Sequence, residues 1–161
     1  MSDQYLSAER LGISHEERAA LIKVAGFIGD AVQQDSVPLS DRMHGSSPMG
    51  VRFNMSFTAV ALVHCGTVAC LGGHVWLVMQ DLEAEDLPNF ATTQEERDAM
   101  TSYVEKFEAR RHEPLAELYY PHYHPAYQAT PEEAARATIN FLATGNPQWI
   151  AVLAGSNGEQ P

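Results

Sequence analysis

Hydrophobic residues recur at helical spacing in three segments of the chain, and each segment begins with the same kind of start signal. The three signals are Ser14-His-Glu-Glu17, Thr93-Gln-Glu-Glu96 and Thr130-Pro-Glu-Glu133. In such a capping box the Ser or Thr hydroxyl and the Glu carboxylate satisfy amides that the first helical turn leaves unpaired. The pattern therefore predicts amphipathic helices over about 14–34, 93–111 and 130–144.

Shorter patterns predict three minor elements. Pro114–Tyr120 is apolar enough for one or two helical turns. Phe53–Thr58 alternates apolar and polar residues, which is the period of a β-strand, and the apolar run Trp149–Leu153 is a candidate for a second strand. Two such strands would form only a small sheet.

The centre of the chain is an uncharged stretch from Phe53 to Gln80. It is long enough to span a bilayer, but His64, the Gly72-Gly73 pair and a change of backbone type near 64–67 argue against a membrane span. We predict a buried helix over about 66–80, apolar nearly all round. Small residues four apart on it mark a face that another helix could approach closely; they are Gly66 with Cys70, and Ala69 with Gly73.

Together these patterns predict a mainly α fold. We expect four to six helices packed around a buried central helix (about 66–80), with at most a small two-stranded sheet. No repeat or linker divides the sequence, so we expect one globular domain over 1–161, with frayed ends at 1–12 and 155–161.

The charge balance limits the classes of partner that the chain can bind. With 21 acidic and 10 basic residues its formal charge is −11, and direct binding to a nucleic acid backbone, which depends on Lys and Arg, is not expected. An acidic surface can keep the protein soluble or dock on a basic partner. Only two cysteines are present and no secretion signal is apparent, so we expect a cytoplasmic protein with reduced thiols.

The two cysteines support two chemical hypotheses. If the helix begins at Gly66, Cys65 lies at its N-terminus, where the helix dipole lowers the pKa of a thiol. A thiol-dependent hydrolase would then need a histidine base, and the candidates are His112, His122 and His124.

The second chemical hypothesis is a metal site. Cys70 and His74 lie four residues apart on one face of the predicted helix and could serve as two zinc ligands. Paired CxxC or HxxxH spacing, typical of zinc sites, is absent from the sequence. We therefore expect no cofactor, with zinc as the alternative.

An aromatic segment supports a third hypothesis, a surface that binds a partner. Tyrosine and histidine residues concentrate in Tyr119–Tyr127, and amphipathic rings are common at protein interfaces. The residues that we expect to bind are Tyr119, Tyr120, His122, Tyr123, His124 and Tyr127.

The run Cys65-Gly-Thr-Val-Ala-Cys-Leu-Gly-Gly-His74 resembles a CGTxxCxxG motif, followed by His or Trp, of small uncharacterised bacterial and phage proteins. A Phe-Xaa-Met stretch before the motif (Phe53–Met55) and the helix start Thr130–Ala135 are also similar. The resemblance implies a bacterial or phage origin, an intracellular setting and a helical fold, and it carries no known activity.

The sequence contains no phosphate-binding Gly-rich loop, no GxSxG elbow and no HExxH pair. We therefore expect a non-enzymatic binding or regulatory protein that acts on a protein partner, phage-encoded and inhibiting a host system. The alternative is the thiol-dependent hydrolase built on Cys65.

Overall fold

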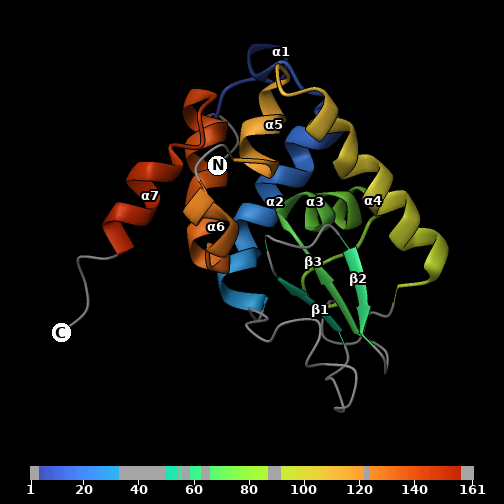
Figure 1. Cartoon of the computed structure of the whole chain (residues 1–161). Coiled ribbons are helices and arrows are strands. Elements are labelled where there is room, and N and C mark those ends of the chain that lie inside the picture. The colour runs from blue at the N-terminus through green and yellow to red at the C-terminus, as the bar shows by residue number, and fades with distance from the viewer. Residues whose placement is uncertain are drawn as a thin grey trace.

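The computed structural model describes residues 4–32, 50–53, 55, 59–62, 66–86, 92–121 and 124–156. Within these residues the fold is mainly α, as the sequence predicted, with more helices than the expected four to six. The elements (Figure 1) are α1 (Ala8–Leu11), α2 (His15–Ala31), β1 (Gly50–Phe53), β2 (Ala59–Leu62), β3 (Gly66–Ala69), α3 (Leu71–Met79), α4 (Gln94–Ala109), α5 (Pro114–Tyr119), the 3₁₀ helix η4 (His124–Gln128), α6 (Pro131–Thr144) and α7 (Trp149–Ser156).

The three predicted amphipathic helices are α2, α4 and α6, and each begins with its capping box. In α6, for example, the Thr130 hydroxyl accepts from the Glu133 amide at 3.2 Å, and the Glu133 carboxylate accepts from the Thr130 amide at 2.8 Å. Gly145 ends this helix in the left-handed conformation, with φ of 80°. The start signals were therefore read correctly.

The sheet corrects the prediction for the central segment. The part of the chain that the structure describes contains three strands where we expected at most two, in the order β1-β3-β2, with β1 parallel and β2 antiparallel to β3. β3 covers Gly66–Ala69, the first part of the predicted helix 66–80, because the backbone of these residues pairs on both sides. β1 ends at Phe53, where the predicted strand 53–58 was expected to begin.

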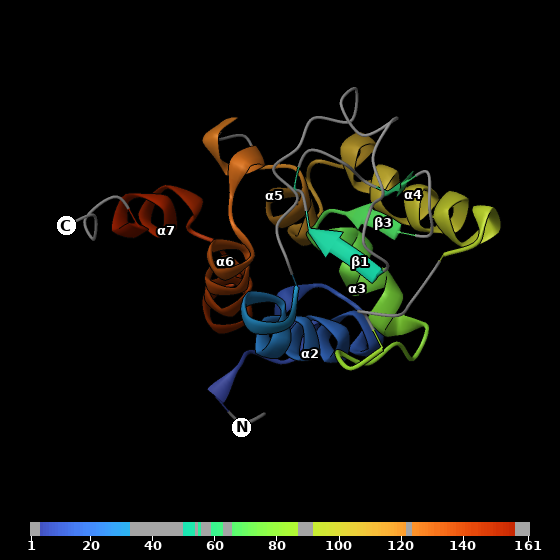
Figure 2. The same ribbon diagram turned by 90° about the horizontal axis from the view of Figure 1, so that it is seen from below.

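The central helix therefore begins at Leu71, with Cys70 as its N-cap residue. Its burial was predicted correctly: Leu71, Val75 and Leu77 are almost wholly covered. α2 and α4 pack against it, and the close approach occurs at Gly72, where a Cβ would lie 3.0 Å from Val104 and 3.2 Å from the Tyr119 ring. α2 and α6 lie side by side next to this centre (Figures 1 and 2).

Two predictions near the chain ends are wrong. The segment 149–153 is the start of helix α7 and not a strand, because Trp149, Val152 and Leu153 share one helical face that packs inward. Residues 4–12 are not frayed, since Leu11 of α1 is 2% exposed and the Leu6 amide donates to the Leu142 carbonyl at 2.9 Å. Pro114–Tyr120 forms the predicted short helix, α5.

α7 occupies one margin of the molecule. Figures 1 and 2 both place it beyond α6, on the side away from the sheet. Its inner face contacts α6 and η4. Within the described part of the chain, no helix is long and apolar enough to cross a membrane.

Candidate functional site

Cys70 lies at the junction of β3 and α3, at the start of the central helix. It is 3% exposed and not part of a disulfide. Burial raises the pKa of its thiol, and hydrogen bonds from the backbone of Gly73 and Gly72 oppose this rise only in part. A thiol in such surroundings is protonated at neutral pH and is a poor nucleophile.

The hydrolase hypothesis loses its structural basis at Cys65. It required Cys65 at a helix N-terminus, but α3 begins at Leu71 and β3 occupies the intervening residues. Cys65 and His122 lie outside the described residues. His112 is exposed beyond the end of α4, and the side chain of His124, in η4, is not described.

Cys70 and His74 lie one turn apart on α3, as the metal hypothesis requires. The His74 ring nitrogen Nδ1 donates to the Cys70 carbonyl at 2.9 Å, which leaves Nε2 as an acceptor. Nε2 is buried and has no hydrogen-bond partner among the described residues, and burial lowers the pKa of His74 to about 4. Among the described residues no group of three His, Cys, Asp or Glu side chains could hold a metal ion. A zinc site at Cys70 and His74 would need further ligands from outside these residues, and it stays the alternative prediction.

The aromatic segment divides into a buried and a partly exposed portion. Tyr119 is 1% exposed and cannot contact a partner, because the apolar face of α5 turns it into the core with Leu115 and Leu118. Tyr120 is half-buried. Of the other predicted binding residues, His122 and Tyr123 lie outside the described residues, and His124 and Tyr127 belong to η4, without described side chains.

The buried Tyr119 belongs to a polar cluster that joins three helices. Its hydroxyl lies 3.3 Å from that of Tyr103 on α4, which donates to Glu17 on α2 at 3.2 Å. Lys106 lies 3.7 Å from the same Glu17 carboxylate and covers the Tyr103 ring. Burial raises the pKa of both phenols, so they stay neutral and act as hydrogen-bonding groups that hold α5 to α2 and α4.

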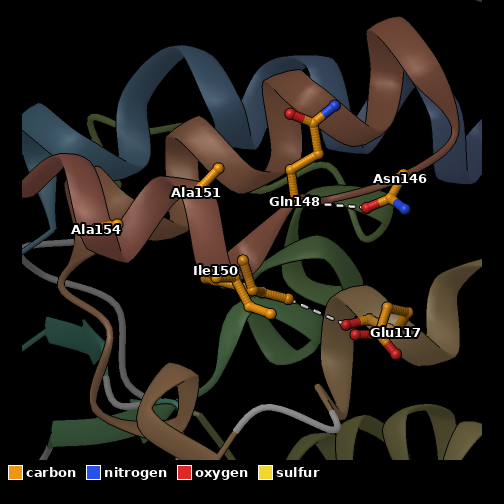
Figure 3. Close-up of a pocket in the computed structure, with 7 residues that line it drawn as sticks. Glu117, Asn146, Gln148, Ile150, Ala151 and Ala154 are labelled. Carbon is orange, nitrogen blue, oxygen red and sulfur yellow. Dashed lines mark hydrogen bonds between the residues drawn. The ribbon is translucent and has the colours of Figure 1, made fainter.

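One concave feature of the described surface is a groove between α5 and α7, here called the α5–α7 groove (Figure 3). Its volume is about 670 Å³, and it is lined by Glu117, Asn146, Gln148, Trp149, Ile150, Ala151 and Ala154. Glu117 comes from α5, and the other residues come from α7 and the turn before it. The Trp149 indole donates to the Glu117 carbonyl at 3.0 Å and fixes the two helices together.

The outer face of α7 exposes apolar side chains in this groove. Ile150 is 66% exposed, the largest value among the large hydrophobic residues that the structure describes. Ile139, at 37%, lines a second hollow of about 270 Å³ on the α6 side of α7, together with Arg136. Ala151 borders both hollows. Ala151 thus lies between two hollows, one lined by Ile150 and the other by Ile139.

The sequence contained one usable signal for this site. The run Trp149–Ser156 contains no charged residue in a chain of net charge −11. Its inward residues, Trp149 and Val152, are three apart, which is helical spacing, and Ile150 falls on the opposite side. We interpreted the first five residues as a strand because so short an apolar run fits both periods.

Comparisons with known proteins found no matching family model, no similar curated protein and no similar solved structure.

Proposed function

We propose that this chain is a non-enzymatic binding or regulatory protein that acts on a protein partner, and that it binds this partner in the α5–α7 groove. The observation that carries the proposal is the exposure of Ile150, 66%, beside a hollow of about 670 Å³. Large apolar side chains at the edge of a concave surface are typical of protein interaction sites.

The position of the groove agrees with the aromatic segment identified from the sequence. Glu117 belongs to α5, which leads directly into that segment, and α7 packs against η4 at its other end. The groove therefore lies beside both described ends of this segment, α5 and η4. Tyr120, which is half-buried, could contribute to it, whereas Tyr119 supports it from within.

The described thiol, Cys70, is not suited to nucleophilic catalysis. A catalytic cysteine needs an accessible thiolate, and Cys70 is buried with a raised pKa. We propose a cytoplasmic setting, where thiols stay reduced, and a phage-encoded inhibitor of a host system as the biological role. The charge of −11 favours a protein partner over a nucleic acid.

A capture experiment tests this function. The tagged wild-type chain and an Ile150→Asp variant are used to recover proteins from a bacterial host lysate. We expect a specific partner with the wild type and its loss with the variant, because a carboxylate in the groove cannot be buried against apolar surface without a large desolvation cost.

The matched control is Ala99→Asp, which adds the same charge at an exposed position of α4, on the other side of the molecule from α7 (Figure 2). This control should retain the partner. Equal capture by the wild type and Ile150→Asp would place binding elsewhere on the surface and refute the proposed site.

A further inference from the structure

We propose that the α5–α7 groove is a conditional site, which exists only while α7 is folded and docked on the rest of the chain. Trp149 stabilises the docked state by holding α7 to α5, and the strained backbone of Gln148 opposes it. This inference rests on the proposed function and adds the regulation of its binding site. It depends on the length of α7, the contact of Trp149 with α5 and the turn before α7.

α7 is too short to keep its helical structure away from the rest of the chain. It has 8 residues, and isolated helices shorter than about 12 residues are marginal in water. Its stability therefore comes from packing on α6 and η4, in which Trp149 and Val152 are 3% and 6% exposed. All the lining residues of the groove except Glu117 belong to α7 and the turn before it. When α7 undocks, the groove is lost with it.

Trp149 joins the docked helix to the opposite wall of the groove. Its indole N–H donates to the backbone carbonyl of Glu117 at 3.0 Å. The wall that receives this bond is itself fixed to the core, because Tyr119 of the same helix is 1% exposed and its hydroxyl lies 3.3 Å from that of Tyr103. The bond can form only when α7 is docked, so it stabilises the docked state.

The backbone of Gln148, directly before α7, acts in the opposite direction. Its φ is 55°, in the left-handed region that is unfavourable for a residue with a Cβ. Side chains from the preceding segment hold this turn: Asn146 Oδ1 accepts from the Gln148 amide at 2.8 Å (Figure 3), and the Asn140 side chain donates to the Pro147 carbonyl at 3.4 Å. Strained backbone persists where its surroundings fix it, and it is concentrated at functional switches. Undocking would release this strain.

The balance of these two effects determines how often a molecule presents the groove. Order and disorder of a short segment is a recognised mode of switching in proteins. A partner that binds the docked state only would shift the population of molecules toward it. Its apparent affinity would be reduced in proportion to the fraction of undocked molecules.

The docking of α7 can be tested on the free, full-length chain. Hydrogen exchange is followed by NMR, residue by residue. Trp149→Phe keeps an aromatic ring and removes the indole N–H, and we expect the α7 amides to exchange about fivefold faster. The matched control is Trp76→Phe, on α3, where the indole donates no hydrogen bond to a described residue. This control should leave exchange in α7 unchanged.

A substitution at position 148 should have the opposite effect. Glycine adopts the left-handed conformation without strain, so Gln148→Gly should slow exchange in α7 by about threefold. Gln148→Ala is the matched control, because it removes the same side chain but keeps the Cβ that causes the strain. Exchange in this control should stay close to that of the wild type. Circular dichroism and thermal unfolding confirm that each variant folds.

Three results would overturn the inference. They are exchange in α7 that slows gradually from Ser156 back to Val152, as in a fraying helix end; exchange no faster in Trp149→Phe than in Trp76→Phe; and equal effects of Gln148→Gly and Gln148→Ala.

The same variants separate this inference from the proposed function. If Ile150→Asp loses the lysate partner while Trp149→Phe and Gln148→Gly leave exchange in α7 unchanged, the proposed function stands and the inference fails. If exchange changes as expected and the wild type recovers no specific partner, the docking equilibrium stands and the proposed function fails.

Discussion

His74 is a neutral histidine enclosed by the core. Its ring is 1% exposed and lies 5.7 Å from the Phe53 ring, between centroids. Burial lowers its pKa from 6.5 to about 4 in the folded state, whereas the unfolded chain keeps the ordinary value. Between these two pH values the unfolded state binds more protons, so the free energy of unfolding falls as the pH falls.

This difference predicts a specific acid sensitivity. The stability that depends on neutral His74 is fully present above about pH 6.5 and is lost as the pH falls toward 4. Between about pH 7 and pH 5 the wild type should lose about 2 kcal/mol more than a His74→Gln variant. Urea unfolding of both proteins at the two pH values measures this, and equal losses would show that His74 keeps an ordinary pKa.

Gly72 is the second residue whose surroundings determine the effect of a substitution. A Cβ at this position would lie 3.0 Å from Val104 and 3.2 Å from the Tyr119 ring. We expect Gly72→Ala to lower the free energy of unfolding by about 1–3 kcal/mol through overpacking, although alanine is the better helix former.

Gly26 provides the matched control for this prediction. It lies in α2, and a Cβ there would have no neighbour within 4 Å. Gly26→Ala should therefore raise the free energy of unfolding by about 0.5–1 kcal/mol. If chemical denaturation shows that both substitutions stabilise the protein, the close approach of α3 to α4 and α5 at Gly72 is not as described.

Among the elements, the helices with their own start signals were predictable from sequence. α2, α4 and α6 have Ser14, Thr93 and Thr130 as their N-cap residues, because each capping box satisfies the first amides with side chains three residues apart. Such a signal requires no knowledge of the rest of the fold. Their apolar faces were also predictable, since hydrophobic residues recur at helical spacing over several turns.

The sheet and α7 were not predictable in the same way. Whether Gly66–Ala69 is strand or helix depends on the backbone of β1 and β2, which lies elsewhere in the sequence. The run 149–153 fits a strand or a helix, and the choice follows from the packing of Trp149 and Val152 on the rest of the fold. The local hydrophobic pattern does not show which distant residues a segment will pair with or pack against.

For the same reason, the sequence indicated only part of the proposed site. The predicted aromatic segment begins in α5, the helix that forms one wall of the groove. It indicated the wrong residue at Tyr119, since one turn of a short helix decides which ring is buried. Ile150 was missed because its exposure appears only when α7 is known to be a helix.

For the whole molecule, the packing implies an unequal distribution of stability. α2 and α6 form the most extensive helix pair, with Leu21, Val24 and Phe141 wholly buried. α7 lies at the margin and exposes most of one face (Figure 2). Elements with few buried contacts open at a lower free energy than the core.

We therefore predict that, among the described helices, hydrogen exchange proceeds earlier through α7 than through α2 and α6. Mass spectrometry of exchange under native conditions should show the amides of Trp149–Ser156 opening well below the free energy of global unfolding. Addition of a protein partner that binds in the α5–α7 groove should slow exchange in α7 more than in α4. Exchange of α7 as slow as that of α2 would show that α7 is an integral part of the core.

The three capping boxes also bear on the order in which the chain acquires its structure. Each box joins residues only three positions apart, so the first turns of α2, α4 and α6 close small loops and lose little chain entropy. The parallel pairing of β1 with β3 joins residues on either side of β2 and can form only after a longer loop closes. On refolding, helical signal should therefore appear before the sheet and the Cys70 junction that β3 holds in place.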